Sequence, residues 1–345
     1  MEVGIIGATQ SGKSTLFTAI TGINPGTEVG KRAVVKVPDT RLDHLTEVFK
    51  PKKKINATIN FIDAPPPQGT GKKTGQAQTF LGFIKTVDAL LVCAPTFLDG
   101  GFKELQDMME ILQLTDLEVV EGMISREAKS KIDPKYTGPN PELLNRLQEV
   151  LTKGGRVADL EFSDKEDSML KSVQLFTRFP MFVVLNISEG EIGGKISEET
   201  KKAQTYLDSL KIPYLSVCAT VEAQIATLPD EDREIFITEY GIKQTATTRV
   251  IQELYDLLGY QTFFTVGEDE CRAWTIYKGD NAVAAAGRVH TDIARGFIRA
   301  ECCTYDDFLA CDNSLQKAKT AAKLRLEGKE YIVKDGEICH FRHSG

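Results

Sequence analysis

The sequence predicts an α/β protein in which a parallel sheet is covered by helices and followed by a smaller β-rich domain. Two observations indicate the parallel sheet: short apolar runs of the buried-strand type recur between Val3 and Val217, and helical patterns separate them. A third observation indicates the second domain, because after Tyr260 the chain changes to short strand patterns divided by turns. The length of 345 residues is enough for two or three domains.

Each expected strand of the sheet is a short apolar run, and each expected helix carries apolar residues at three and four spacing. The lysines at positions 52–54 interrupt these patterns and are expected to form a solvated loop. The expected strands are residues 3–6, 34–37, 57–62, 89–94, 181–185 and 214–217, and the expected helices between the first of them are residues 14–21 and 41–49.

Strand patterns disappear between Leu112 and Phe176, where two charged helical stretches flank breaks at Asp133-Pro134 and Gly138-Pro139. The sequence therefore predicts a helical hairpin inserted into the α/β domain. The leucine-rich stripe at residues 143–151 is expected to serve packing, with a partner site as the alternative.

The expected domains are the α/β domain at 1–115 and 177–260, a helical insertion at 116–176 and a C-terminal domain at 262–345. Within the last of these, a tight hairpin is expected to join 331–333 to 337–339 through Lys334-Asp335-Gly336.

The composition excludes several classes of partner. With a formal net charge of -7, the chain has no bulk attraction to nucleic acid or anionic membranes, so any RNA contact must use a local basic patch. We expect neither membrane association nor recognition of a DNA sequence. No apolar stretch is long enough to span a membrane and the N-terminus lacks a signal-peptide pattern, so a cytoplasmic protein is expected. The seven cysteines form no C-x-x-C pair and are expected to be reduced, mostly buried thiols.

The first expected strand runs into a glycine-rich segment, GATQSGKS at residues 7–14, that satisfies G-x-x-x-x-G-K-[ST]. Glycines let the backbone wrap phosphates, whose charge is stabilised by backbone N–H groups and the N-terminus of the following helix. Lys13 reaches the β and γ phosphates and Ser14 can ligate Mg²⁺. An incidental glycine turn is the alternative, but the setting between a strand and a helix favours a nucleotide site.

Longer stretches carry a resemblance to a known family. In the N-terminal part they are VPDTRLD at 37–43, FID at 61–63, FL at 80–81, VDA at 87–89 and DLEVV at 116–120. In the C-terminal part they are RAWTI at 272–276, HTD at 290–292, RGFIRAE at 295–301, YDDF at 305–308 and LEGKEYIV at 326–333. With these stretches the chain resembles the YchF/Obg-like ATPase family over nearly its whole length, most weakly between residues 23 and 75.

The resemblance implies an Obg-type P-loop NTPase domain with a helical insertion and a C-terminal TGS domain of the ubiquitin-like β-grasp fold. It also implies association with the ribosome or structured RNA, and a preference for ATP over GTP. Carried over residue by residue, it assigns the phosphates to Gln10, Ser11, Gly12, Lys13, Ser14 and Thr15. It assigns Mg²⁺ to Ser14 and Asp63, and base recognition to Asn186, Ile187 and Glu189. Cys218 and Ala219 belong to a loop whose backbone N–H is expected to meet the base.

The base-recognition segment, NISE at 186–189, differs from the N-K-x-D of ordinary GTPases, whose aspartate accepts two hydrogen bonds from guanine. Adenine has an acceptor where guanine has a ring donor, so an aspartate there would penalise adenine with an unpaired buried charge. Glu189 is longer by one methylene and need not occupy that place. A surface turn after the strand is the alternative, although the end of a strand is where a ligand is expected.

Two switch segments depart from the family pattern. The family has D-x-A-G followed by an apolar residue, whereas this chain has Asp63-Ala64-Pro65-Pro66-Pro67. Pro66 has no N–H to sense a γ-phosphate, and Pro67 cannot orient water. The threonine that binds Mg²⁺ in switch I is not recognisable, and Thr27 is a possible substitute. Nucleotide binding is therefore expected, while slow hydrolysis and a non-hydrolysing paralogue both remain open.

The C-terminal domain alternates basic and aromatic residues that could engage RNA or could belong to the core and its edges: Arg272, Trp274, Tyr277, Lys278, Arg288, Arg295, Phe297 and Arg299. His290 has no flanking nucleophile or metal set and is expected to be structural. A metabolic P-loop kinase is disfavoured because a TGS-like domain offers no acceptor chemistry. The oligomeric state is not predicted.

Overall fold

The computed structural model describes residues 1–26, 30–65, 86–129, 139–170, 173–229, 232–233, 235 and 244–344. It divides into an N-terminal unit, residues 1–34 and 60–250, and a C-terminal unit, residues 35–59 and 251–345. This differs from the expected division, because residues 35–59 group with the C-terminal domain, which also begins earlier than residue 262. None of the described helices combines the length and the apolar character needed to cross a lipid bilayer.

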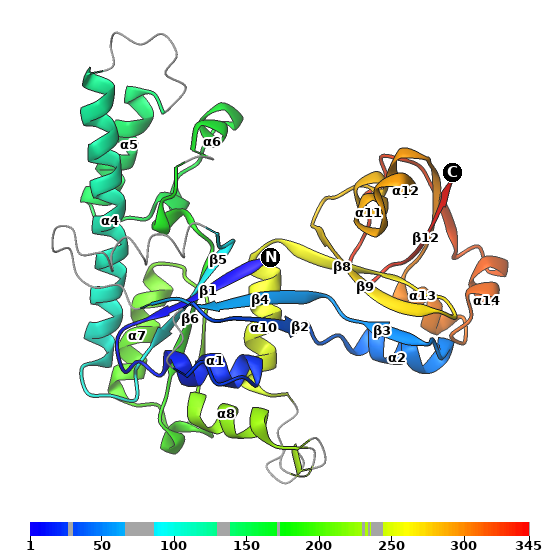
Figure 1. The fold of residues 1–345 in the computed structure, drawn as a ribbon, viewed down its shortest axis with the longest axis horizontal. Coiled ribbons are helices and arrows are strands. Elements are labelled where there is room, and N and C mark those ends of the chain that lie inside the picture. Colours follow the sequence, from blue (N-terminus) through cyan, green and yellow to red (C-terminus); the bar gives the residue numbers. More distant parts are fainter. Residues whose placement is uncertain are drawn as a thin grey trace. The chain divides into compact units, whose positions relative to one another are not determined.

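The sheet of the N-terminal unit has the strand order β2-β4-β1-β5-β6-β7 (Figure 1). The pairs β1–β4, β1–β5, β5–β6 and β6–β7 are parallel, as expected from the alternating pattern. All six residues of β5 and of β6 are buried, which explains their unbroken apolar runs. The strands are β1 (Glu2–Gly7), β2 (Arg32–Lys36), β4 (Thr58–Asp63), β5 (Ala89–Ala94), β6 (Met181–Asn186) and β7 (Tyr214–Val217).

Helices cover this sheet. Alternate strand residues such as Ile6, Val92 and Val183 pack against α4 and α7, and α1 packs against α8. The inserted helices have a second apolar core, in which Leu143, Leu147 and their neighbours are buried, so the leucine stripe serves packing. The helices are α1 (Lys13–Thr21), α4 (Gly101–Lys129), α5 (Pro141–Thr152), α6 (Asp164–Leu170), α7 (Glu198–Ser209), α8 (Ala219–Thr227) and α10 (Ala246–Leu257), with 3-10 turns η1 (Val157–Asp159), η2 (Phe176–Arg178) and η3 (Glu189–Glu191).

The C-terminal unit has a mixed sheet with the order β11-β10-β12-β8-β9-β3 (Figure 1). Its core joins the sheet to helices α11 and α12 and includes Phe263, Ala285 and Phe341. This is the β-grasp arrangement that the resemblance implied. The elements are α2 (Thr40–Phe49), β3 (Lys53–Ile55), β8 (Tyr260–Thr265), β9 (Glu270–Tyr277), α11 (Ala282–Val289), α12 (Thr291–Arg295), β10 (Phe297–Cys303), α13 (Tyr305–Ala310), α14 (Leu315–Thr320), β11 (Arg325–Glu327) and β12 (Ile338–His343).

Two local expectations were wrong in this unit. The lysine-rich segment is not a loop but the edge strand β3, which pairs in parallel with β9. The hairpin between 331–333 and 337–339 does not form, because β12 pairs with β10 and β8, while Ile332 makes an isolated bridge to Asn281. The turn at Lys334-Asp335-Gly336 instead leads into β12, with Gly336 at a φ of 76°.

A fully buried carboxylate fixes the insertion to the N-terminal unit. Asp116 of α4 accepts hydrogen bonds from the backbone N–H groups of Phe176 (2.7 Å) and Thr177 (2.8 Å) and from the Thr177 hydroxyl (2.7 Å). Burial raises the pKa of Asp116 to about 6, although these hydrogen bonds act in the opposite direction. The ionised form is therefore less favoured in the folded protein than in the unfolded chain.

This raised pKa predicts a pH-dependent stability. Since the folded pKa lies above the unfolded value of about 3.8, the contribution of Asp116 is largest below that value and is lost as pH rises through about 6. A shift of roughly two units corresponds to about 3 kcal/mol. Urea unfolding measures the unfolding free energy of the wild type and of Asp116→Asn, whose side chain at position 116 does not titrate. The wild-type value minus the variant value should fall by about this amount between pH 4 and pH 8. A constant difference would contradict the assignment.

Candidate nucleotide-binding site

The glycine-rich segment is the turn between β1 and α1, and it opens onto a cavity of about 660 Å³. Gly12 precedes α1 with a φ of 84°, and no side chain caps the first turn of that helix. The Ser11 N–H donates to the Ala8 oxygen (3.2 Å), so the N–H groups at the start of α1 are the ones that an anion can bind, with the positive end of the helix dipole behind them. Gln10 also has a positive φ, 68°, which is unusual for a residue other than glycine and is common in functional loops.

Two glycines of this turn are required by close packing. A Cβ on Gly7 would lie 2.5 Å from Oγ of Ser11 and 3.0 Å from the carbonyl oxygen of Cys93. A Cβ on Gly12 would lie 2.2 Å from Nδ2 of Asn186. The contacts with Oγ of Ser11 and Nδ2 of Asn186 are closer than real Cβ atoms essentially ever come, so the fold explains the glycines at these two positions.

Asn186, the last residue of β6, holds the phosphate loop in place. Its Nδ2 donates to the carbonyl oxygen of Ser11 (3.0 Å), and its Oδ1 accepts from the N–H of Ala219 (3.0 Å). Its backbone oxygen accepts from the N–H of Phe97 (2.9 Å) and the hydroxyl of Thr96 (3.2 Å). Only 5% of Asn186 is exposed, so these bonds form away from water.

A buried thiol supports the same carbonyl. Sγ of Cys93 in β5 donates to the carbonyl oxygen of Ser11 at 3.3 Å. Burial raises the pKa of Cys93 to about 12, which keeps the thiol protonated and able to donate. Ser11 thus lies beneath the cavity as a structural residue of the loop, and it does not line the cavity wall.

Lys13 and Asp63 form an ion pair with each other. The Lys13 side chain is 12% exposed and Asp63, at the end of β4, is 8% exposed. The backbone of Asp63 is fixed by bonds from the Gly30 N–H (3.0 Å) and to the Lys31 oxygen (2.9 Å). The two residues expected to meet the phosphates and Mg²⁺ therefore neutralise each other in this structure.

The donor set fits a magnesium ion. Asp63 supplies a carboxylate at the carboxyl end of a strand, and Ser14, exposed in the first turn of α1, supplies a hydroxyl. Hard oxygen ligands of this kind, completed by phosphate oxygens and water, are what Mg²⁺ prefers. Thr27 and residues 66–70, which include Pro66 and Pro67, lie outside the described residues.

The far end of the cavity is formed by the segment that follows β6. Ile187 and Ser188 line it together with Glu189, which is exposed. Glu191, which the sequence did not single out, holds this segment: it accepts bonds from Ser188, from the Ser197 N–H (2.9 Å) and from the Thr200 hydroxyl (2.9 Å). Burial alone would raise the pKa of Glu191, but these bonds outweigh it and leave the pKa below its ordinary value.

Most of the expected contact residues meet at this one cavity, but Ser11, Asp63 and Ala219 do not line it. The N–H of Ala219 is donated to Asn186, and Cys218 and Thr220 line the wall instead. Phe97 also lines the cavity and was missed, although its place just after β5, at the carboxyl end of a parallel strand, could have indicated it. The expected residues on the wall are Gln10, Gly12, Lys13, Ser14, Thr15, Asn186, Ile187, Glu189 and Cys218.

The basic and aromatic residues of the C-terminal unit are only partly available to a partner. Phe297 is buried in the core, and the guanidinium of Arg272 stacks on Trp274 with its carbon 3.8 Å from the ring centre. Tyr277 is exposed, as is Arg295. His290 accepts a bond from the Asp292 N–H (3.2 Å) and caps α12, as expected for a structural residue.

These features define a P-loop nucleotide-binding protein: a phosphate loop at a free helix N-terminus, on a parallel sheet, with a cavity at the carboxyl ends of its strands. Comparison with known proteins supports the same class of protein. A model described as "50S ribosome-binding GTPase" matches residues 2–123, and the YchF GTPase C-terminal model, described as "Protein of unknown function (DUF933)", matches residues 260–344.

The particular family follows from full-length relatives. The chain is 37% identical to the "Ribosome-binding ATPase YchF" of Bacillus subtilis and 35% identical to that of Escherichia coli O157:H7, with 99% of this chain and 99% and 98% of those proteins covered. Its structure matches the YchF GTPase of Schizosaccharomyces pombe with a TM-score of 0.84 at 26% identity, covering 99% of this chain and 97% of the other. The chain belongs to the YchF family, and the expected fold class is confirmed.

The contact between Gly12 and Asn186 gives a prediction. Gly12→Ala should weaken binding of a nucleoside triphosphate by at least about tenfold, because the new Cβ meets Asn186 and a left-handed conformation costs an alanine about 1–2 kcal/mol. Gly190→Ala is the matched control, since a Cβ there meets nothing within 4 Å. Fluorescence titration with labelled ATP measures both affinities. If Gly12→Ala bound labelled ATP as tightly as the control variant, the close approach of Gly12 to Asn186 would not be needed for binding.

Proposed function

We propose that this protein binds a purine nucleoside triphosphate with Mg²⁺ in the cavity above Gly12, favours ATP over GTP, hydrolyses it slowly and associates with the ribosome. One observation carries the nucleotide assignment: the free N-terminus of α1 and the base-recognition segment bound the same cavity of about 660 Å³. Its volume lies in the ordinary range of small-molecule pockets.

Within that cavity each residue has a distinct role. Backbone N–H groups at the start of α1 surround the phosphates, and Lys13 exchanges Asp63 for phosphate oxygens. Asp63, released from Lys13, joins Ser14 as a ligand of Mg²⁺, which neutralises phosphate charge. Phe97, whose backbone is tied to Asn186, offers a ring at the cavity wall on which the nucleotide can pack.

The preference for ATP rests on Ile187 and Glu189. Ile187 replaces the lysine of guanine-specific proteins and presents an apolar side chain. Glu189 is exposed on a short 3-10 turn, so a base does not have to face a buried, unpaired carboxylate.

Ribosome association rests on the relatives, whose names read "Ribosome-binding ATPase". Because the net charge is -7, contact with ribosomal RNA needs a local surface, and exposed arginines such as Arg295 and Arg299 in the C-terminal unit are the proposed contacts. The proposal includes a cytoplasmic location, where ATP and ribosomes are found.

Nucleotide titration tests the site. Lys13→Ala should weaken ATP binding by roughly thirtyfold or more, since losing the partner of a buried charge costs about 2–5 kcal/mol. Lys195→Ala removes an exposed lysine outside the cavity and should leave the affinity unchanged. A far-UV spectrum and a melting curve check that Lys13→Ala is folded. Unchanged affinity in the Lys13 variant would remove the site assignment, and GTP binding more than about tenfold tighter than ATP would contradict the base preference.

Phosphate release separates the ATPase from the non-hydrolysing alternative. Since Pro66 has no N–H and Pro67 cannot position water, unaided turnover should not exceed the slow end of P-loop switches, about 10⁻⁴ per second. The assay compares wild type with Lys13→Ala, with and without ribosomes, because a contaminating ATPase would survive the substitution. Lys13-dependent turnover above about one per minute without a partner would defeat the prediction. Complete absence of Lys13-dependent turnover, even with ribosomes, would favour the paralogue that holds nucleotide as a stable ligand.

A further inference from the structure

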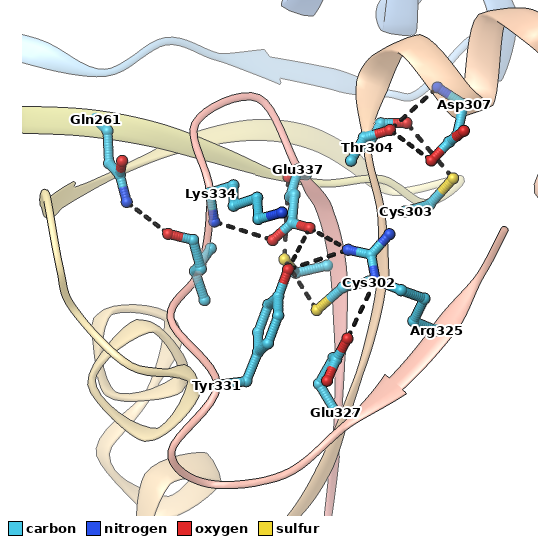
Figure 2. Close-up of polar contacts among 12 residues, drawn as sticks. Gln261, Cys302, Cys303, Thr304, Asp307, Arg325, Glu327, Tyr331, Lys334 and Glu337 are labelled. Carbon is cyan, nitrogen blue, oxygen red and sulfur yellow. Dashed lines mark hydrogen bonds and ion pairs between the residues drawn. The ribbon is translucent and has the colours of Figure 1, made fainter.

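Two cysteines of the C-terminal unit lie side by side in its core. Cys302 of β10 and Cys339 of β12 are direct partners in the antiparallel register, and their sulfur atoms are 3.7 Å apart (Figure 2). Cys302 is fully buried and Cys339 is 2% exposed. They stand 37 positions apart in the chain, so no sequence spacing reveals the pair.

Glu337 is the polar neighbour of this pair. Its carboxylate is within 4.8 Å of both sulfur atoms, and it is fully buried. It is already bound to the guanidinium of Arg325, to the Tyr331 hydroxyl (2.7 Å) and to the Lys334 N–H (3.0 Å), as Figure 2 shows.

These partners disfavour a metal ion between the three ligand atoms. The positive charge of Arg325 already neutralises Glu337, and a divalent cation would be placed close to that guanidinium. A zinc site also needs a fourth ligand. The described residues offer three donors here and no more. The two sulfur atoms are therefore better placed to react with each other than to hold a cation.

We propose that Cys302 and Cys339 are an oxidation site at which a hydroperoxide forms a reversible intrachain disulfide between β10 and β12. The peroxide oxidises one thiol to a sulfenic acid and is itself reduced, hydrogen peroxide leaving as water. The second thiol then attacks the sulfenic sulfur, the S–S bond forms, and the hydroxyl leaves as a second water. A dithiol such as dithiothreitol returns both thiols. This inference is independent of the nucleotide site.

Reaction requires a local opening, because the thiols are shielded in the closed core. The contact with Cys302 and burial hold the pKa of Cys339 well above its ordinary value, so little thiolate forms while the sheet is intact. The pair lies near the end of β10 and the start of β12. Cys302 is also paired with Arg325 of β11, an edge strand of three residues. Fraying of so short a strand exposes the pair without unfolding the unit.

The test uses the reduced full-length protein. It is incubated with hydrogen peroxide under native conditions, quenched with N-ethylmaleimide and examined by intact mass and peptide mapping. The expected product has lost two hydrogen atoms, contains one linked peptide pair joining positions 302 and 339, and is reversed by dithiothreitol. Because the bond closes a loop of 37 positions, the melting temperature should rise by about 5 °C or more.

Matched variants make the result specific. Cys302→Ala should abolish the linked peptide, whereas Cys271→Ser should leave it unchanged, since that thiol is buried in β9 and contacts the Leu45 oxygen. If Cys302→Ala does not fold, the peptide map of the oxidised wild-type protein still shows whether a disulfide joins positions 302 and 339. Three outcomes would overturn the proposal: no linked peptide, a linked peptide formed no faster than global unfolding, or one equivalent of Zn²⁺ that binds and blocks alkylation of both thiols.

Discussion

The side chain of Asn186 is the constraint on which the nucleotide site depends. Its buried amide joins the phosphate loop at Ser11 to the start of α8 at Ala219, and its backbone oxygen holds a third segment, just after β5, at Phe97. Each bond lies in a buried environment, where an unpaired partner would cost about 1–3 kcal/mol. The bonds also explain the loop sequence, because the amide occupies the space that a side chain at Gly12 would need.

The opposite charges of Lys13 and Asp63 balance each other within the site. Lys13 and Asp63 would each be a costly buried charge if they stood alone, and as a pair they remove most of that cost. A nucleotide with Mg²⁺ brings one anionic and one cationic partner, so both residues can exchange their present contact for another of opposite charge. Removing either residue would leave the other as a largely buried charge without this partner.

The sequence predicted the parts of the fold that depend on local patterns. Strands at 89–94 and 214–217 have the expected bounds, and the first of them is an unbroken apolar run whose six residues are all buried. Strand β3 was missed because a run of three lysines, two of them in the strand, is typical of a loop, and edge strands tolerate charge. The phosphate loop was predicted from its motif, whereas the role of Phe97 depends on Asn186, which is distant in sequence. Glu191 acts locally, and its spacing from Ser188 is that of a capping box, a signal the sequence analysis did not use.

The segment VPDTRLD at 37–43 shows why a resemblance of sequence does not by itself assign a role. It lies between β2 and β4, near expected switch residues, yet it belongs to the C-terminal unit. Asp39 caps α2 and binds Arg41, and the guanidinium of Arg41 also binds Asp335 at 2.6 Å and lies over the ring of Phe264. Asp335 in turn accepts from the Thr262 N–H, at the turn where a hairpin was expected. Burial opposes the charge of Arg41, but its bonds to Asp39 and Asp335 outweigh that and raise its pKa. These contacts explain the motif through the folding of the C-terminal unit.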